Sequence, residues 1–330
     1  MSQIQEVKEA SDIVALIGER IQLQRSSSNF RGLCPFHGER SPSFFVSETM
    51  QRYKCFGCGE TGDVFTFLER YEAMTFGESM KYLAERAGIA LTQYHSNQED
   101  DHKEQLLAVL NLAKEYYHYL LTTHPAGEPA RAYLKERGIT AESIRLFQLG
   151  YSLDSWQELL SYLHGKKKFS LELLAEAGLT VSGKQNRPYD RFRGRLMFPL
   201  TNHRGQVVGF SGRILDSEAK EAKYINSPET TLYHKSQMLY GYSELFQEIR
   251  KKKEIIIVEG EVDVISSSQA HVNNVAAIKG SAFTADHLKL ISRVAETLLF
   301  SLDMDSAGTA ATKRAITLTK DHALDLRVIV

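Results

Sequence analysis

The stretch Glu254-Ile-Ile-Ile-Val-Glu-Gly-Glu-Val-Asp263 decides the fold class of the second half of this chain. Its aliphatic run predicts a buried strand over 254–258, and Glu259 and Gly260 follow directly at the carboxyl end. Strands and helices then alternate, with helices expected over 263–270, 285–293 and 308–320 and strands over 275–278, 297–303 and 326–330. Strands separated by helices predict a parallel sheet with right-handed crossovers.

Acidic residues end two of these expected strands. Glu259 ends the first, and Asp303-Met-Asp305 ends the strand that begins at Thr297. Ligands bind beyond the carboxyl ends of parallel strands, and residues two apart on a strand share one face, so the three acids should converge. Hard oxygen ligands suit Mg²⁺ or Mn²⁺. The sequence predicts a divalent-metal site here, and surface acids that cap a helix are the alternative.

All three cysteines belong to one motif, Cys34-Pro-Phe-His37 followed by Cys55-Phe-Gly-Cys58. Each short spacer lets a tight turn aim two ligands at one ion, and four protein ligands fill the tetrahedron of a structural zinc ion. A Cys55–Cys58 redox pair, or buried thiols beside a bystander histidine, are the alternatives. Basic and aromatic residues surround the ligands and suit single-stranded nucleic acid, unless the rings are the core: Arg31, Arg40, Phe44, Phe45, Arg52, Tyr53, Lys54 and Phe56.

These patterns predict an α+β multidomain protein, with a small zinc-ribbon domain followed by a mixed α/β core. We expect a domain over 1–95, a linker over 96–104, a second unit over 105–253 and the parallel-sheet unit over 254–330. Within the first domain, Thr75 and Glu78 have capping-box spacing and Gly88 is a helix stop. A long amphipathic helix is expected over 103–122, more helices up to about 178, and strands over 195–200 and 206–210.

The composition indicates a soluble globular protein, with 42% hydrophobic and 25% charged residues among 330. No apolar run approaches the ~20 residues of a membrane span, and the N-terminus has no secretion leader, so we expect a cytoplasmic protein without membrane contact. Residues 184–235 hold ten basic and five acidic residues, whereas residues 254–330 hold seven basic and ten acidic ones. Such polarity suits a site where anionic ligands and metal ions meet, although clustered surface charge would give the same counts.

Several further motifs appear in the order found in bacterial DnaG-type DNA primases, and the chain resembles that family over nearly its whole length. The first 95 residues are similar to its zinc-binding domain through Gly32-Leu-Cys34-Pro-Phe-His37 and Cys55-Phe-Gly-Cys58. Its RNA polymerase domain is matched by Tyr189-Asp-Arg191-Phe-Arg193, Gly205-x-Val-Val-Gly-Phe-Ser-Gly-Arg213 and Lys223-Tyr-Ile-Asn-Ser-Pro-Glu-Thr230. The Glu259-Gly260 and Asp303-x-Asp305 elements resemble the Toprim fold that the family shares with topoisomerases and some nucleases.

The resemblance implies a DNA-dependent RNA polymerase that makes short RNA primers on single-stranded DNA from ribonucleoside triphosphates. It implies that Glu259, Asp303 and Asp305 hold catalytic Mg²⁺ or Mn²⁺, and that Cys34, His37, Cys55 and Cys58 hold structural Zn²⁺. It further implies basic contacts to template or nucleotide from Arg137, Arg191, Arg193, Arg213, Lys223 and Lys235. A replicative helicase is the expected partner, through a C-terminal domain beyond this sequence.

The sequence departs from the family pattern in three places. Met304 stands where the family usually has glycine, which should crowd the metal face. Glu261 stands where an aromatic residue is usual, which should add negative charge near the acids. The sequence stops at Val330 while the family continues, so we expect an amino-terminal fragment that is incomplete for activity. The rival interpretations are a Toprim nuclease or topoisomerase, and a non-catalytic zinc-ribbon module that binds nucleic acid.

Overall fold

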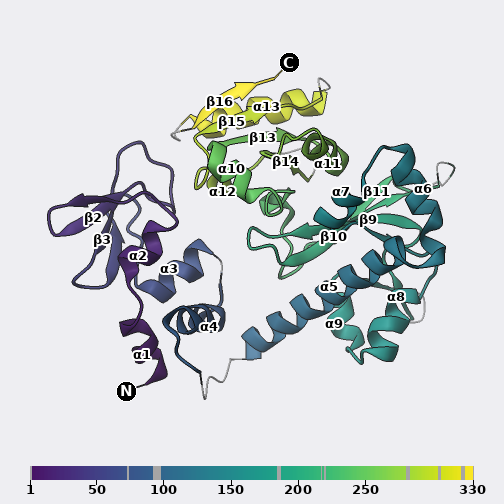
Figure 1. The fold of residues 1–330 in the computed structure, drawn as a ribbon, viewed down its shortest axis with the longest axis horizontal. Coiled ribbons are helices and arrows are strands. Elements are labelled where there is room, and N and C mark those ends of the chain that lie inside the picture. Colours follow the sequence, from purple (N-terminus) through teal and green to yellow (C-terminus); the bar gives the residue numbers. More distant parts are fainter. Residues whose placement is uncertain are drawn as a thin grey trace.

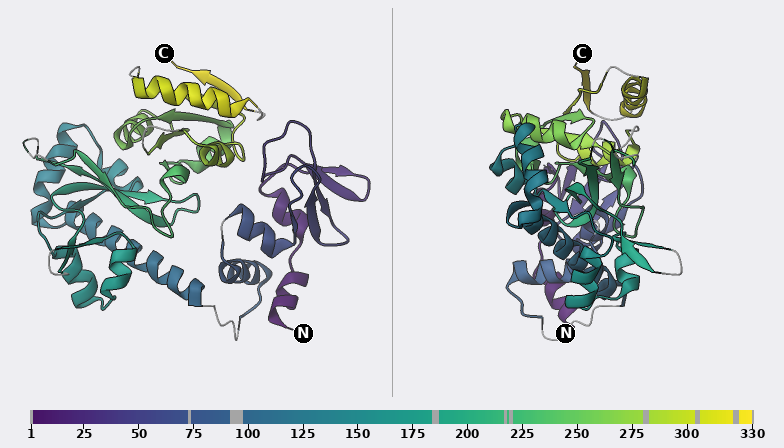
Figure 2. Two further views of the ribbon diagram at one scale, coloured as in Figure 1. Left: turned by 180° about the vertical axis from the view of Figure 1, so that it is seen from behind. Right: turned by 90° about the vertical axis from the view of Figure 1, so that its right-hand side faces the viewer.

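The computed structural model places three main β-sheets in two lobes (Figures 1 and 2). It describes residues 2–72, 74–91, 98–183, 187–216, 218, 221–279, 283–303, 306–320 and 324–329. The first lobe, purple to blue in Figure 1, holds the elements before α5, and the second holds everything from α5 onward. Within the described residues, no helix combines the length and apolarity that crossing a bilayer requires.

The first lobe is an antiparallel ribbon packed on four helices. Its strands pair in chain order, β1 Gln24–Ser26, β2 Asn29–Gly32, β3 Phe44–Ser47, β4 Arg52–Cys55 and β5 Thr61–Gly62. Its helices are α1 Gln3–Glu9, α2 Ile13–Gly18, α3 Val64–Tyr71 and α4 Phe76–Ala87. The capping box of α4 is confirmed, because Glu78 N–H donates to Thr75 Oγ1 and Thr75 N–H donates to Glu78 Oε2. Gly88 ends α4 in the left-handed conformation that glycine adopts without strain.

The long helix α5 spans Gln98–Thr122 and starts five residues before the expected Lys103. Most of the expected linker is therefore helical. Polarity suggested a loop, but acidic residues at positions 100 and 101 suit a helix N-terminus, where they meet unpaired N–H groups. Asp100 is in fact buried.

An antiparallel sheet lies against α5, in the strand order β11–β10–β9–β6. The expected strands are confirmed as β9 Arg195–Thr201 and β10 Val207–Ile214, and β11 is Tyr224–Asn226. The stretch expected to be helical up to 178 also contains β6 Gly150–Ser152, which pairs with β9. Around this sheet lie η1 Pro125–Gly127, α6 Glu128–Glu136, α7 Ala141–Leu146, α8 Glu158–Leu160, η2 Ser161–Lys166, α9 Leu171–Glu176, β7 Thr180–Ser182 and β8 Pro188–Asp190. Two elements that follow in the chain, η4 Lys235–Gln237 and α10 Phe246–Lys252, pack instead on the parallel-sheet unit.

The expected parallel sheet is present, with the order β12–β14–β13–β15–β16. Its parallel strands are β13 Glu254–Val258, β14 Val275–Ile278, β15 Thr297–Phe300 and β16 Asp325–Val328. The helices are α11 Glu261–Gln269, α12 Ala285–Ile291 and α13 Ser306–Thr319. One edge differs from the expectation, because β12 Leu239–Tyr240 joins β14 in an antiparallel pair. β15 also ends three residues before Asp303, which leaves that acid in the connection to α13.

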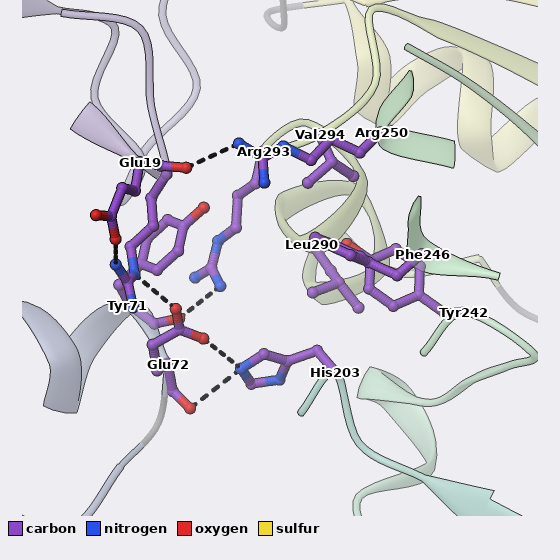
Figure 3. Close-up of a pocket in the computed structure, with 11 residues that line it drawn as sticks. Glu19, Tyr71, Glu72, His203, Tyr242, Phe246, Arg250, Leu290, Arg293 and Val294 are labelled. Carbon is purple, nitrogen blue, oxygen red and sulfur yellow. Dashed lines mark hydrogen bonds and ion pairs between the residues drawn. The ribbon is translucent and has the colours of Figure 1, made fainter. Parts of the chain in front are cut away.

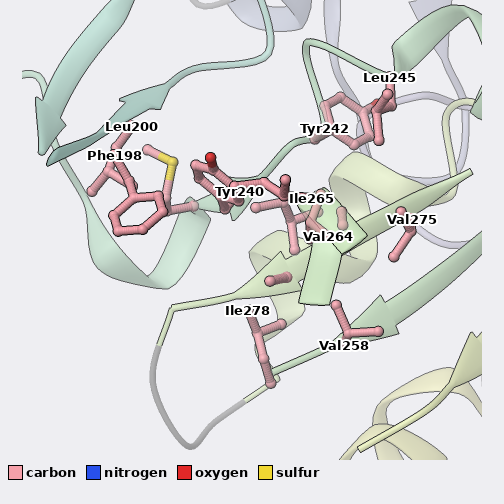
Figure 4. Close-up of a cluster of buried hydrophobic side chains, with 14 of the residues drawn as sticks. Phe198, Leu200, Tyr240, Tyr242, Leu245, Val258, Val264, Ile265, Val275 and Ile278 are labelled. Atoms are coloured by element: carbon pink, nitrogen blue, oxygen red, sulfur yellow. The ribbon is translucent and has the colours of Figure 1, made fainter. Parts of the chain in front are cut away.

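One hydrophobic core joins the two sheets of the second lobe, as Figure 4 shows for part of it. Alternate residues of β9 point to opposite faces, so Leu196, Phe198 and Leu200 pack toward the parallel sheet. Met197 instead belongs to the cluster beneath α5. Both faces of β9 are covered, which explains why six of its seven residues are buried. The parallel sheet, at whose edge the expected acids lie, thus packs through this core against the antiparallel sheet.

Polar contacts join the two lobes around a cavity of about 270 Å³ (Figure 3). Arg293 donates to the Tyr71 carbonyl at 2.7 Å, and its guanidinium lies 4.4 Å from the centre of the Tyr71 ring. Glu72 contacts Arg20 at 2.8 Å within its own lobe and His203 at 3.6 Å across the boundary. Burial would raise the pKa of Glu72, but the bonds and charges of His203 and Arg20 outweigh it and lower the pKa to about 2.

Candidate functional site

Two of the expected acids meet at the carboxyl edge of the parallel sheet. Glu259 follows β13, and its Oε1 accepts a hydrogen bond of 3.0 Å from the backbone amide of Asp303, just beyond β15. The parallel pairing of Ile257 with Phe300 brings the ends of these strands side by side. Glu259 is half-buried and Asp303 is exposed. Asp305 and Met304 lie outside the described residues, so the place of the third acid stays a prediction.

Gly308, in the first turns of α13, packs directly against this edge. A Cβ atom there would lie 2.1 Å from the Asp303 carbonyl oxygen and 3.0 Å from Glu259 Oε1. The backbone of α13 can approach the two acids only because residue 308 has no side chain. Glu259, Asp303 and the start of α13 are therefore closely packed together.

Asp263 is a neighbouring acid that was not among the expected metal ligands. Its Oδ2 accepts the Gly260 amide at 3.0 Å and so caps the N-terminus of α11. Burial raises the pKa of Asp263, and the charges of Asp303 and Glu261 add to that rise against the bond from Gly260. Carboxylates crowded in this way favour a bound cation, because each charge opposes ionisation of the next.

Glu261 does not add the unbalanced negative charge expected of it. Its side chain is 4% exposed and forms a buried ion pair with Lys279, whose side chain is 7% exposed. Lys279 also donates to Ser211 Oγ at 3.2 Å, on β10 of the antiparallel sheet. Sequence reasoning assigned Lys279 no role, because its partners lie 18 and 68 residues away along the chain.

The four expected zinc ligands come together between β2, β3 and β4. Their ligand atoms all lie within 4.8 Å of one another. The Cys34 and Cys58 sulfur atoms are 3.8 Å apart, and Cys55 Sγ lies 3.8 Å from His37 Nδ1. A tetrahedral ion with zinc–sulfur bonds of about 2.3 Å has edges of about 3.8 Å between its ligands. The donor set and its spacing therefore fit zinc.

Outer contacts hold these ligands in place. Glu39 Oε2 lies 3.4 Å from His37 Nε2, which leaves Nδ1 to face the sulfur atoms, and Glu39 Oε1 accepts the Cys34 amide at 2.6 Å. Burial would raise the pKa of the Cys55 thiol, but hydrogen bonds from Ser43, Cys58 and Gly57 outweigh it and lower that pKa. Such second contacts orient and tune metal ligands. Sequence reasoning missed Glu39, although it lies two residues from His37.

The aromatic residues near the zinc ligands divide into two groups. Phe44 and Tyr53 are buried and stack in the core with their ring centres 5.1 Å apart. Phe56 is 67% exposed, lies 5.3 Å from Phe45, and carries Lys54 Nζ at 5.1 Å from its ring centre. Some of the aromatic rings therefore form the core of the ribbon, and others lie on its surface.

Two of the six expected basic contacts share an aromatic partner. The guanidinium groups of Arg137 and Arg213 lie 5.4 Å and 5.1 Å from the centre of the Tyr133 ring. Arg213 also donates to Tyr224 Oη at 2.9 Å. Lys279 Nζ lies 5.9 Å from the same Tyr224 ring, so this basic cluster adjoins the Glu261 ion pair.

The other four basic residues are spread over the antiparallel sheet and its loops. Arg193 lies 4.2 Å above the exposed ring of Trp156. Arg191 is half-buried, and burial lowers its pKa. Lys223 and Lys235 are both exposed. The structure does not gather these four into one cluster.

Sequence profiles of three families match consecutive parts of the chain. Residues 1–99 match the CHC2 zinc finger, residues 116–246 match the N-terminal domain of the DNA primase catalytic core, and residues 256–330 match a Toprim-like domain. Together with the geometry, the first match supports a zinc site with three cysteines and one histidine. The Toprim match supports a divalent-metal site without naming the metal.

Whole-chain comparisons decide the family. The crystal structure of the Aquifex aeolicus primase, with its zinc-binding and RNA polymerase domains, superposes with a TM-score of 0.63 at 33% identity. The match covers 100% of this chain and 79% of that one. This chain belongs to the DnaG-type DNA primase family. The DNA primase of Clostridium acetobutylicum is 40% identical over 326 residues, which are 99% of this chain and 54% of that protein.

Further members of the family match only parts of this chain, or are longer than it. Another DnaG primase structure, a catalytic domain bound to single-stranded DNA, matches 69% of this chain with a TM-score of 0.63 at 32% identity. The present chain spans about half the length of the curated primases it matches. The expected zinc ribbon, α/β core and Toprim sheet are all confirmed, because each part of the chain matches the corresponding family profile.

Proposed function

We propose that this chain carries the zinc-binding and nucleotidyl-transfer parts of a DNA primase, which makes short RNA primers on single-stranded DNA. The observation that carries the proposal is the bond between the Asp303 amide and Glu259, which joins two acids from separate strands at one edge. The Arg137–Tyr133–Arg213 cluster adjoins that edge through Lys279. Domain limits of 1–95, 105–253 and 254–330 are part of the proposal.

In this proposal Glu259, Asp303 and Asp305 hold Mg²⁺ or Mn²⁺. The donor set fits such ions, since it offers hard carboxylate oxygens that meet at one edge of the sheet. When bound, divalent ions stabilise the attacking and leaving oxygens of phosphoryl transfer. The chain itself orients the acids, through the Asp303 amide on Glu259 and the close approach of Gly308.

The basic residues would position template and ribonucleoside triphosphate. Arg213 is held between Tyr133 and Tyr224, so its guanidinium is pre-oriented before a phosphate arrives. Arg193 on Trp156 offers a cation beside an exposed ring, a surface that suits single-stranded bases and phosphates. Arg137, Arg191, Lys223 and Lys235 would add neutralising charge along the same sheet and loops.

The zinc ribbon would contact template with its exposed face. Lys54 and Phe56 lie together on that face, at 5.1 Å, and the zinc ion would hold the strands that carry them. Four protein ligands leave no open position, so the zinc ion is structural in this proposal. The expected replicative helicase remains a prediction that these contacts do not test.

The test is a primer-synthesis assay with this chain extended to the full length of the primases it matches, single-stranded DNA, Mg²⁺ and labelled ribonucleoside triphosphates. A ladder of short RNA that disappears in Asp303→Asn would support the proposal. Metal-dependent cleavage of the DNA without RNA synthesis would favour a Toprim nuclease. DNA binding with neither product would favour a non-catalytic module.

A binding assay separates the template contacts from the metal chemistry. Trp156 is the single tryptophan of the chain, so its fluorescence reports on the surface beneath Arg193. We expect single-stranded DNA to quench this signal, and Arg193→Gln to weaken binding and reduce its salt dependence. Arg145→Gln, at an exposed position of α7 to which no nucleic-acid contact is assigned, is the matched control for losing a charge elsewhere. Quenching that is unchanged in Arg193→Gln would contradict the role given to Arg193.

A further inference from the structure

The ion pair of Glu261 and Lys279 lies at the same sheet edge as Glu259. Val258 pairs with Ala277 in the parallel register, so Lys279 leaves β14 level with Gly260. The two side chains are 4% and 7% exposed. Removing two such charges from water is costly, and apolar replacements of similar size are often as stable as the pair. Stability alone therefore gives little reason for an ion pair in this place.

The pair fastens one end of α11 to the antiparallel sheet. Glu261 is the first residue of α11, and Lys279 reaches from Glu261 to Ser211 on β10. Ser211 is fully buried and lies two residues before Arg213 on the same strand. The N-terminus of α11 is thereby fixed against the strand that carries a basic residue of the proposed site.

The other end of α11 is fastened as well. Gln269, its last residue, accepts the Thr140 amide at 2.9 Å through Oε1 and donates to the Gly138 carbonyl at 3.0 Å through Nε2. These two partners closely follow Arg137 in the chain. The helix thus runs from the acidic edge to the loop that carries Arg137. A side-chain ion pair holds its first residue, and side-chain hydrogen bonds hold its last.

We propose that Glu261 and Lys279 are positioning residues, which set α11 so that Glu259 and Asp303 can share a metal ion beside the basic cluster. Neither residue is assigned a contact with the metal or the substrate, and both act through α11. The inference rests on the proposed function, because it takes Glu259 as a metal ligand.

The test measures Mn²⁺ binding to the chain by electron paramagnetic resonance, alongside thermal unfolding. Lys279→Met alone leaves a buried, uncompensated carboxylate and should impair folding. The double variant Glu261→Leu/Lys279→Met removes both charges and should fold. Its Mn²⁺ affinity should nevertheless fall at least ten-fold. The matched control is Glu296→Leu/Lys253→Met, which makes the same changes in an ion pair that is 69% and 48% exposed. The control should keep wild-type affinity.

The outcomes separate this inference from the proposed function. If Glu259→Gln weakens Mn²⁺ binding but the folded Glu261→Leu/Lys279→Met variant binds like wild type, the pair is only structural and the inference is overturned. If Mn²⁺ binding survives Glu259→Gln unchanged, the proposed metal site is wrong and the inference fails with it. A ten-fold loss in the double variant, with unfolding near the wild-type temperature, supports positioning.

Discussion

The backbone amide of Asp303 donates a hydrogen bond of 3.0 Å to Glu259 Oε1, across a separation of 44 residues. One proposed metal ligand is therefore oriented by the main chain of another. The bond does not depend on the Asp303 side chain, and it requires only an acceptor at position 259. A substitution at position 259 can thus remove the negative charge and keep the hydrogen bond from the Asp303 amide.

Glu259→Gln should keep the fold and lose the metal. The glutamine carbonyl can still accept the Asp303 amide, so the free energy of unfolding should change by no more than about 1 kcal/mol. The neutral amide is a poor ligand for a hard cation, and we expect Mn²⁺ affinity to fall by about ten-fold or more. Calorimetric titration with Mn²⁺ and thermal unfolding provide the two measurements.

The control for this variant is Glu296→Gln, which removes a carboxylate from an exposed ion pair in the same sheet unit. It should leave Mn²⁺ affinity unchanged. Equal loss of affinity in both variants would indicate a general effect of net charge and would count against a specific role for Glu259.

Gly308→Ala should disturb the packing of α13 against Glu259 and Asp303, because the added methyl group would clash with the backbone of Asp303. The added methyl would lie 2.1 Å from the Asp303 carbonyl oxygen, and neither backbone can yield without moving the acids. We expect a destabilisation of about 1–3 kcal/mol in chemical unfolding, together with weaker Mn²⁺ binding.

Gly18→Ala is the matched glycine control. Position 18 ends α2, and a methyl group added there would have nothing within 4 Å, so alanine should be neutral or stabilising by up to about 1 kcal/mol. If Gly308→Ala behaved like Gly18→Ala, the close packing of α13 on the acids would be wrong.

Zinc removal should unfold the ribbon and spare the second lobe. Two of the three thiols in the cluster are buried, and structural zinc supplies roughly 10–16 kcal/mol to small zinc-finger peptides. A chelator should therefore abolish the far-ultraviolet circular-dichroism contribution of β1 to β5. The fluorescence of Trp156 should stay constant, since it lies in the second lobe. A parallel change in both signals would show that the lobes do not unfold separately.

Features that depend on neighbouring residues in the sequence could be predicted, whereas contacts between distant residues could not. The zinc ligands Cys34, His37, Cys55 and Cys58 could be predicted because each pair lies within one turn. The place of Glu259 at the carboxyl edge of the sheet could be predicted because it follows an aliphatic strand, and its role as a metal ligand stays a prediction. Glu261 was misjudged because its counter-charge, Lys279, comes from another strand and no local pattern pairs them. The antiparallel edge strand β12 was missed for a similar reason, since two residues carry no periodicity and only pairing with β14 makes them a strand.

His287 gives a separate prediction, about pH. It is 1% exposed at the start of α12, where its Nδ1 accepts the Thr284 amide at 3.2 Å and its own amide donates to Thr284 Oγ1 at 3.1 Å. Burial lowers the pKa of His287 to about 4. The folded state therefore prefers the neutral ring. The stability that follows is fully present above the unfolded pKa of ~6.5 and is lost as the pH falls through about 4.

Substituting His287→Gln should remove that loss, because glutamine at this position can still accept the Thr284 amide but does not titrate. Between pH 7 and pH 5 the wild type should lose on the order of 2 kcal/mol more stability than the variant, as the unfolded ring takes up a proton that the folded one resists. Thermal unfolding at both pH values gives the difference, and contributions shared by the two proteins, including the zinc site, cancel. His271→Gln, at an exposed histidine, is the matched control for the substitution itself. Parallel curves for the wild type and His287→Gln would mean that the imidazole is accessible to a proton in the folded protein, and that the packing around α12 is looser than these contacts indicate.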